Sequence, residues 1–281
     1  LVALPLVAVL TVTTTAAYAG LVSRIRDDQV TESSALAVSK KHPGYAYTLN
    51  DDEPTDQAIV YTVKISTGTV TGATILSGVT PVDPEALSFD RDGRLWYADT
   101  GADGLRKDND NRDANPPTLY RFVEPSSVSG THSVSVRRYP LAYPDDKHWD
   151  VETLVINPKT DAKHLVTKEP DTKGKRLAIT SSLVRDHPNQ VFEREKLTDK
   201  VSDGSFTPNG KWVVVRSPKK AYVYYASVPW RLHASFDLPT MVQPESLSFD
   251  PSGKQFLIGS EGADSPLYWL SFDQTKGNRP S

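Results

Sequence analysis

One pattern of residues occurs five times along the chain, and it restricts the fold more than any other feature. Each copy has an acid, a small residue, an apolar run, a tight turn and a second apolar run. The copies are ESSALAVSKKHPGYAYTLND from Glu32, PEALSFDRDGRLWYADTGAD from Pro84, VETLVINPKTDAKHLVTKE from Val151, SDGSFTPNGKWVVVRSP from Ser202 and PESLSFDPSGKQFLIGSEGAD from Pro244. Short apolar runs separated by turn residues predict paired β-strands, so we expect a hairpin in each copy.

The turns between the paired runs have the residues that tight turns need. They read HPG, RDG, PKTD, PNG and PSG, in which proline presets the first turn position and glycine accepts a positive φ. Two more strand-like runs follow the hairpins, for example residues 58–65 and 70–76. Four antiparallel strands per repeat, with no helical periodicity between them, predict an all-β chain in which each repeat is one blade of a β-propeller.

The end of the chain predicts both the blade count and the closure of the ring. The fifth copy supplies only three strands, the last over residues 266–272, and residues 21–27 can add the missing outer strand. An N-terminal strand that completes the last blade would remove the open sheet edge. We therefore predict a single propeller of five blades. Six blades are the alternative, which would need an extra blade within residues 99–143.

Residues 1–19 have the character of an export signal. They are uncharged and mostly apolar, and Ala17-Tyr18-Ala19 forms a small-x-small cleavage pattern. A membrane anchor is the alternative, but Pro5 and a run of threonines make a poor span. The prediction is a signal peptide over 1–19 and one propeller domain over 20–281, secreted from a bacterial cell, with no membrane span after cleavage.

Composition excludes several classes of function. The 281 residues are 38% hydrophobic and 24% charged, which is typical of a globular protein that needs no cross-links. The absence of cysteine excludes disulfides, thiolate metal sites and cysteine nucleophiles. A net charge of −3 excludes a strongly basic nucleic-acid binder.

Propeller geometry predicts that the repeated acids meet. Each innermost strand lines the central channel and begins with the acid, so the acids should gather at one channel mouth. They are Glu32, Glu85, Glu152, Asp203 and Glu245. The second strands end on the same face, and their ends supply Asp51, Asp99, Lys168, Glu169, Arg216 and Glu261.

Converging carboxylates raise one another's pKa unless cations or a metal compensate. Lys168 and Arg216 are the available cations. Calcium is the expected metal, because it takes six to eight oxygen ligands in irregular geometry, whereas no histidine falls at a repeat position to favour zinc. Two alternatives remain open: the acids bond backbone N–H groups between blades, or they form a purely catalytic ring.

Other motifs are weaker. The run Asp108–Asp113 resembles the start of a calcium loop but lacks the glycine and closing glutamate of an EF-hand. It belongs to a loop, residues 103–117, that we expect to overhang the acidic face. His148 is the one histidine near the ring. Trp96, Trp212 and Trp269 are expected in the core, whereas Trp149 and Trp230 lie in connections and are the tryptophans expected to meet a ligand.

The five repeats, together with the run WYADTGADGLRKDNDNRD and the later TLYRFVEP, resemble a family of secreted actinobacterial propellers. That family is grouped with WD40-like propellers and with proteins called "esterase-like activity of phytase". Calcium-dependent β-propeller phytases have a similar plan, and their acidic face holds calcium and phosphate. This chain departs from the pattern at residues 99–103, which an inserted loop follows, and at Asp203, which has a shorter side chain than glutamate.

Two functions follow as hypotheses. In the first, the exported propeller is a binding or scaffold protein whose calcium-stabilised acidic face or overhanging loop recognises an envelope glycan, peptide or protein. In the second, the chain is a metal-dependent hydrolase of a phosphoester, ester or lactone, taking a small anionic substrate. Glu85, Glu152 and Glu245 would then hold the metal, with Asp99, Glu152 and Glu261 as catalytic candidates and Lys168 and Arg216 as substrate ligands.

Overall fold

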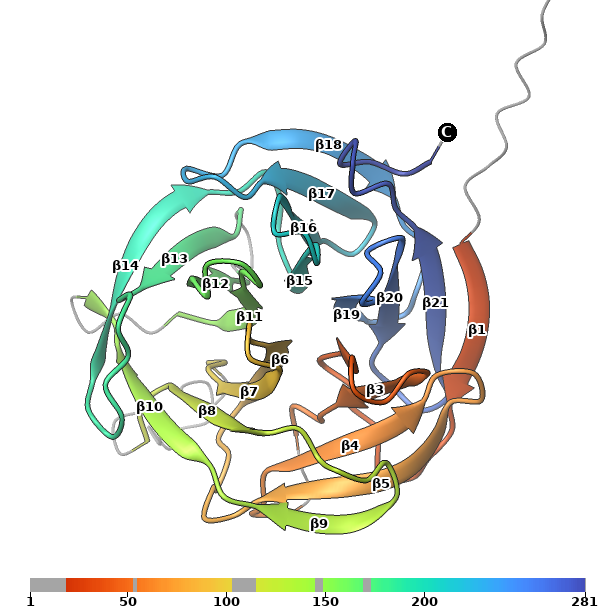
Figure 1. Cartoon of the computed structure of the whole chain (residues 1–281), viewed down its shortest axis with the longest axis vertical. Coiled ribbons are helices and arrows are strands. Elements are labelled where there is room, and N and C mark those ends of the chain that lie inside the picture. The colour runs from red at the N-terminus through yellow and green to blue at the C-terminus, as the bar shows by residue number, and fades with distance from the viewer. Residues whose placement is uncertain (1–18, 53–54, 103–114, 145–148, 169–172, 281) are drawn as a thin grey trace, which may run out of the picture.

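The computed structural model describes residues 19–52, 55–102, 115–144, 149–168 and 173–280. Within these ranges the chain is all-β, with no α-helix and hence no helix that could cross a membrane. Strand groups surround a central axis in a propeller-like arrangement, with the first strand of each group nearest the axis (Figure 1). The all-β prediction is confirmed.

Each predicted repeat forms one antiparallel group of four strands. The first group contains β2 (Ala37–Val38), β3 (Tyr45–Thr48), β4 (Ile59–Lys64) and β5 (Thr69–Leu76), and the second contains β6 (Pro84–Phe89), β7 (Arg94–Asp99), β8 (Thr118–Val123) and β10 (Arg137–Ala142). The third contains β11 (Val151–Ile156), β12 (Lys163–Thr167), β13 (Lys175–Ile179) and β14 (Asn189–Lys196), and the fourth contains β15 (Asp203–Phe206), β16 (Trp212–Arg216), β17 (Lys220–Tyr225) and β18 (Leu232–Asp237). The fifth contains β19 (Pro244–Phe249), β20 (Gln255–Ser260), β21 (Ser265–Ser271) and β1 (Ala19–Ile25).

Two parallel contacts link the outer strands. Strand β9 (Gly130–Val134) lies parallel to β5, and β10 lies parallel to β14 through two residue pairs. The second contact merges the second and third groups into one eight-stranded sheet. Within the described ranges there are thus four sheets but five strand groups. The predicted blade count depends on whether the eight-stranded sheet is divided into two blades.

The turn chemistry is as the sequence predicts. Gly93 and Gly253 occupy the hairpin turns of the second and fifth groups with φ of 74° and 70°, where a side chain would be strained. In the third group the PKTD turn has no glycine, and Asp161 takes the positive φ of 63° instead. These tight turns let each inner hairpin reverse direction and return to the face on which it began.

The core fills the spaces between neighbouring groups. One cluster joins the fourth and fifth groups through Val214, Val223, Leu247, Phe256 and Leu270. The tryptophan predictions are partly wrong. Trp149 and Trp230 are buried in clusters of this kind, because the connections that carry them fold back over the sheets. Trp269, expected in the core, is only half-buried.

The N-terminal strand closes the ring, as predicted. Strand β1 pairs antiparallel with β21, from Ala19 opposite Leu270 to Ile25 opposite Ser265. Ile25 has no solvent exposure and packs between the fifth and first groups against Leu36 and Leu267. The chain therefore joins its two ends non-covalently through one sheet.

If β1 closes the ring, truncating its buried side chain must weaken the whole fold. We expect Ile25→Ala to lower the free energy of unfolding by about 2–5 kcal/mol, through lost burial and the cavity that remains. Leu21→Ala in the same strand is the control. Leu21 is 52% exposed, so its loss should change stability by about 0.5 kcal/mol or less. Urea unfolding measures both, and equal effects would contradict the closure.

Candidate metal centre at the acidic channel mouth

The face on which the inner strands begin gathers the predicted acids around one end of the channel. We call this end the acidic mouth. Its members influence one another's pKa: Glu85 lies within range of Glu152, Asp83 and Asp51, and Glu261 within range of Glu32 and Glu245. The described members are Glu32, Asp51, Asp83, Glu85, Asp150, Glu152, Asp203, Glu245 and Glu261, with the cations Lys168 and Arg216.

Three of the repeated acids occupy a special backbone position. The hairpin register shifts across Glu85, across Glu152 and across Glu245, so each glutamate is an extra residue opposite its partner strand. Such a shift, a β-bulge, bends the strand and re-aims the side chain. Asp203 is different, because it pairs directly with Arg216 in an unbroken register. The repeated acids are thus of two kinds: three glutamates at β-bulges and one aspartate in regular pairing.

Lys168 neutralises part of this charge. Its Nζ lies 2.8 Å from Glu152 Oε2 and 3.7 Å from Glu245 Oε1, bridging the third and fifth groups. Burial lowers the pKa of Lys168, but the attraction of Glu152 and Glu245 outweighs burial and raises it above its ordinary value. The amine therefore stays protonated and tied to carboxylates. Its predicted role as a substrate ligand would require these ion pairs to open.

Further carboxylates converge beside the second and third groups. Burial, and then repulsion from Glu152 and Asp83, raises the pKa of Glu85 well above its ordinary value. Asp83, Glu85 and Asp150 each place one carboxylate oxygen within 4.8 Å of the others. These three residues form the metal-centre candidate, which we call the acidic triad.

Asp83 and Asp150 are not among the site residues predicted from the sequence. Both precede a repeated glutamate by two residues, in Asp83-Pro84-Glu85 and Asp150-Val151-Glu152. Residues two apart in a strand share a face, so a D-x-E pattern doubles the carboxylates at one strand end. Only the second and third repeats carry it. That signal was present in the sequence and marks the pair of repeats that meet at the triad.

The segment after β7 builds the cradle for the triad. The N–H groups of Thr100 and Gly101 donate to the carbonyl of Asp83, and Ala102 N–H donates to Asp150 Oδ1 at 3.1 Å. A methyl group on Gly101 would overlap the Asp83 carboxylate and lie 2.6 Å from Glu85 Oε1. Glycine at position 101 therefore lets the carboxylates of two residues pack directly on the backbone.

The spacing of the triad is compatible with a calcium ion. Calcium–oxygen distances of about 2.3–2.6 Å place ligand oxygens on opposite sides of the ion about 5 Å apart, and adjacent ligands closer. Oxygens within 4.8 Å of one another lie inside that range. All three ligands are hard oxygens and none is a histidine, which disfavours zinc.

Asp203 and Arg216 do not face this centre. Asp203 is buried, and its Oδ2 accepts the N–H of Leu247 at 2.6 Å, which fixes the fourth group to the fifth. Arg216 has no solvent exposure, and its Nη1 donates to the carbonyls of Ser246 and Gly259. The prediction that Arg216 binds a substrate anion does not agree with this burial. For Asp203 the alternative of an inter-blade hydrogen bond is realised.

Asp99 and Glu261 differ in whether their carboxylates are available for a catalytic role. The Asp99 carboxylate accepts the N–H groups of Val82 and Asp83, so it holds the strand leading into β6 and is not presented as a catalytic acid. Glu261 is at the mouth, where burial and repulsion from Asp51 and Glu245 raise its pKa to about 8. Its Oε2 accepts the side-chain amide of Gln243 at 2.9 Å.

Glu245 completes the mouth on the side of the fifth group. Its Oε2 is buried and has no hydrogen-bond partner among the described residues, while its Oε1 faces Lys168. Glu32 is half-buried at the start of the first group. Four predicted features lie wholly or almost wholly outside the described residues: the signal peptide over 1–19, of which only Ala19 is described, the Asp108–Asp113 run, His148 and Glu169.

Neither a family model nor a curated protein matches the chain. Among solved structures, a gluconolactonase from Xanthomonas campestris is 16% identical over 89% of this chain and 91% of its own, with a TM-score of 0.49. Hydrazine synthase from Kuenenia stuttgartiensis is 14% identical over 81% of this chain and 61% of its own, with a TM-score of 0.45. A protein from Lactobacillus plantarum is 11% identical over 88% and 69%, with a TM-score of 0.41. At these values the likenesses carry no argument about function.

The cradle makes Gly101 a sensitive position. We expect Gly101→Ala to force Asp83 and Glu85 apart, to cost about 1–3 kcal/mol of stability and to reduce the rise in Tm that calcium produces. Gly20→Ala is the matched control, because a methyl group there meets no atom within 4 Å. Differential scanning calorimetry with EDTA and with calcium measures both effects. An unaltered calcium response in Gly101→Ala would contradict the cradle.

Stability should also depend on pH in a defined direction. The pKa of Asp51 is raised to about 6 and that of Glu261 to about 8, in both cases first by burial. A raised pKa means that the fold favours the protonated acid, so this contribution to stability is present at pH 4 and is lost as pH rises to about 8. In EDTA, Tm should fall over this interval, and Glu261→Gln should flatten the upper part of the fall. Asp28→Asn, at an exposed acid, should leave it unchanged.

Proposed function

We propose that this chain is an exported, five-bladed propeller whose acidic mouth binds calcium and which serves as a binding or scaffold protein at the cell envelope or outside the cell. The observation that carries the proposal is the acidic triad, in which three buried or half-buried carboxylates of two neighbouring repeats converge. A bound metal would offset the repulsion between these carboxylates, which is stronger because burial removes the screening by water. Its partners would be an envelope glycan, peptide or protein.

The blade count is part of the proposal. The eight-stranded sheet divides naturally at the β10–β14 contact, which is parallel and only two residue pairs long, whereas pairing within each half is antiparallel. Each half then matches one sequence repeat and one four-stranded group. This division gives five blades, with β1 as the outer strand of the last.

In the calcium site Asp83, Glu85 and Asp150 would be the protein ligands, with Glu152 and Glu245 as further carboxylates of the mouth. When bound, the ion would supply positive charge that lowers the pKa of these acids and locks the second and third groups together. The triad spans both groups, since Glu85 belongs to β6 and Asp150 precedes β11. Calcium would thus act first as a stabiliser of the face.

The absence of an available cation favours binding over phosphoester hydrolysis. Among the described residues of the acidic mouth, Lys168 is engaged by two carboxylates and Arg216 is enclosed by backbone carbonyls. Among the residues of this face that the structure describes, a phosphate would meet carboxylates while both cations are already engaged. Phosphoester hydrolysis therefore has less support than the binding of a neutral ligand.

An ester or lactone hydrolase remains the second candidate, on one specific observation. Glu261, with a pKa of about 8, can exchange a proton near neutral pH at the mouth. Carboxylates in a cleft whose pKa is strongly shifted often belong to catalytic sites. In that case Glu261 would act as the general base, Glu152 would be held by Lys168, and metal carboxylates would lie across the mouth.

Calcium binding can be measured directly. At 100 times its dissociation constant, calcium should stabilise the fold by about 2.7 kcal/mol, which is visible as a rise in Tm after EDTA treatment. Glu85→Gln should abolish most of the rise, because it removes a central carboxylate, and Asp28→Asn should retain it. An equal rise in both variants, or no rise in the unaltered protein, would refute the calcium site.

Activity assays distinguish the binding function from the hydrolase function. Assays with simple esters and lactones in calcium should show no turnover if the domain only binds. Turnover that requires calcium and is lost in Glu261→Gln, while Asp28→Asn keeps it, would establish the hydrolase and overturn the binding proposal.

A further inference from the structure

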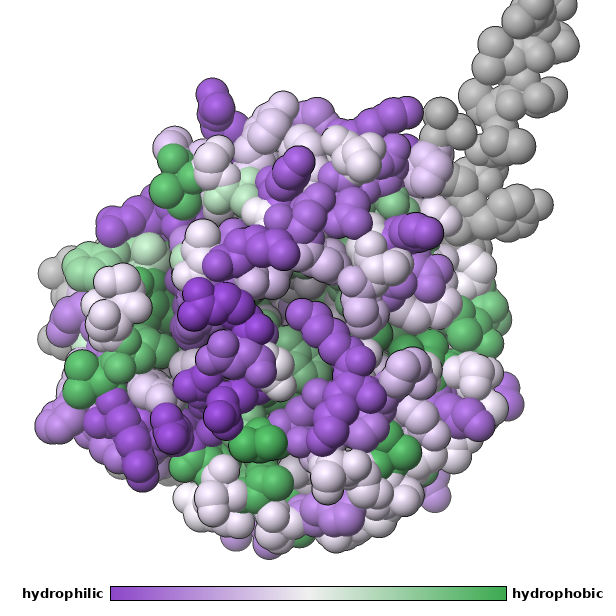
Figure 2. Space-filling model, viewed as in Figure 1, coloured by the Kyte–Doolittle hydropathy of each residue, from purple (hydrophilic) through white to green (hydrophobic). Residues whose placement is uncertain are grey.

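A groove lies on the face opposite the acidic mouth, between the first and fifth strand groups. It has a volume of about 540 Å³ and its lining includes Val22, Lys40, Pro43, Ile65, Pro251 and Trp269. Lys40, Pro43 and Pro251 come from the inner hairpin turns, which point away from the mouth, whereas Val22 and Trp269 lie within the strands β1 and β21. The space-filling view shows how the centre of the ring is hollowed (Figure 2).

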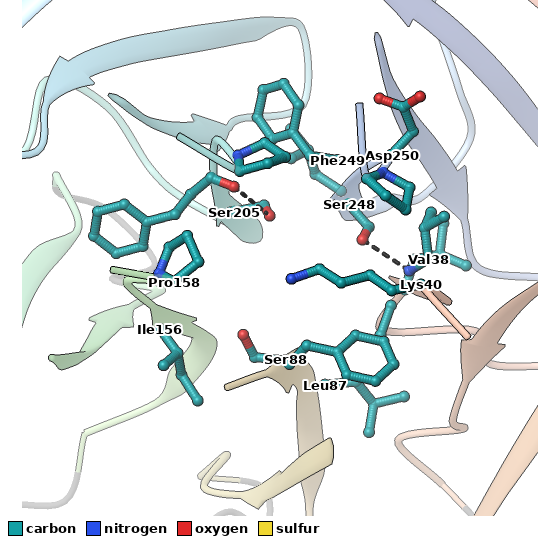
Figure 3. A pocket seen from close by; sticks show the side chains of 18 residues that line it. Val38, Lys40, Leu87, Ser88, Ile156, Pro158, Ser205, Ser248, Phe249 and Asp250 are labelled. Atoms are coloured by element: carbon teal, nitrogen blue, oxygen red, sulfur yellow. Dashed lines mark hydrogen bonds between the residues drawn. The ribbon is translucent and has the colours of Figure 1, made fainter. Parts of the chain in front are cut away.

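The groove continues into the far end of the central channel. A smaller pocket there, of about 60 Å³, is also lined by Val38, Lys40, Asp250 and Pro251. Lys40 thus stands where the outer groove and the channel meet. In Figure 3 its side chain extends toward the middle of the channel pocket, between Ser88 and Ser205.

We infer that this groove is a second ligand site, distinct from the acidic mouth, and that it binds a sugar carrying a negative charge. The sugar ring would lie over Trp269, and its carboxylate or other anionic group would approach Lys40. The inference does not depend on calcium or on the function of the acidic mouth.

Trp269 supplies the surface for the ring. It lies on β21 between Gly20 of β1 and Leu257 of β20, and it packs on one side against the cluster that contains Val38 and Ile65. The indole is only half-buried, and its N–H has no hydrogen-bond partner within the described ranges. A flat aromatic ring with a negatively polarised face attracts the C–H bonds of a sugar, and the free N–H can donate to a hydroxyl.

Lys40 supplies the charge selection. It is exposed, and its ammonium group forms no ion pair or hydrogen bond with any described residue. Asp250, an acid of the lining, is oriented within its own turn, where its carboxylate accepts the Ser252 hydroxyl at 2.8 Å. An unpaired cation beside a pocket favours a ligand with an anionic group, since a charge-assisted contact is stronger than a neutral one.

The rest of the lining agrees with a sugar. Pro43 and Pro251 give rigid, apolar walls, while Ser66 and Gln255 add a hydroxyl and an amide at the rim. Neither of these two side chains is bonded to another described residue, so both can meet sugar hydroxyls. A volume of about 540 Å³ is within the range of about 300–1,000 Å³ of small-ligand sites.

The test titrates sodium glucuronate into the purified full chain in EDTA and follows heat by calorimetry. We expect glucuronate to bind, glucose to bind more weakly, and Lys40→Gln to weaken glucuronate at least about tenfold without changing glucose. Lys219→Gln is the matched control, because Lys219 is an exposed lysine in the β16–β17 turn on the other face. Trp269→Phe should weaken both sugars while it retains the packing of an aromatic ring.

Each other result overturns the proposal. Failure of glucuronate to bind at millimolar concentration, or equal binding by Lys40→Gln and the unaltered protein, removes the site. Tighter binding of a triglutamate peptide with the same Lys40 dependence would make an acidic peptide the occupant. Since EDTA is present throughout, these outcomes are separate from success or failure of the calcium site.

Discussion

Repulsion between buried carboxylates is the constraint around which the acidic mouth is organised. The fold brings one acid from each repeat to the same end of the channel, where burial denies them the screening of water. The structure offsets this cost in three ways. Asp203 is held by a backbone N–H, Glu152 and Glu245 share Lys168, and Glu85 accepts the hydroxyl of Ser34. Three carboxylates of the mouth converge in the acidic triad, and this is where a metal would contribute most.

The same constraint explains why the repeats are not equivalent. A β-bulge aims Glu85, Glu152 and Glu245 into the mouth, whereas the unbroken register at Asp203 keeps its shorter side chain among backbone groups. Closure by β1 makes these positions interdependent, because the ring cannot widen to separate the charges. Ring closure therefore contributes to stability and also keeps the carboxylates of the acidic mouth close together, where a cation would offset their repulsion.

The two faces of the ring differ in chemistry. One carries carboxylates with two enclosed cations, and the other carries Lys40 and the partly exposed Trp269 beside proline walls. The two proposed sites lie on opposite faces, so a metal at the triad and a charged sugar in the groove would not compete.

The sequence by itself determined the repeats, the hairpin turns, the all-β class and the closing strand. Those features depend on neighbours in the chain: apolar alternation, proline and glycine in turns, and a final repeat that lacks one strand. Local pattern also placed the acids on one face. It did not determine which acids would be held by backbone N–H groups or cations, because that depends on register shifts and on contacts between strand groups. Arg216 reads as an exposed cation at a strand end, yet the fifth group covers it completely. Asp83 and Asp150 gain their importance only when two repeats meet across Gly101, a juxtaposition that packing creates between residues 67 positions apart.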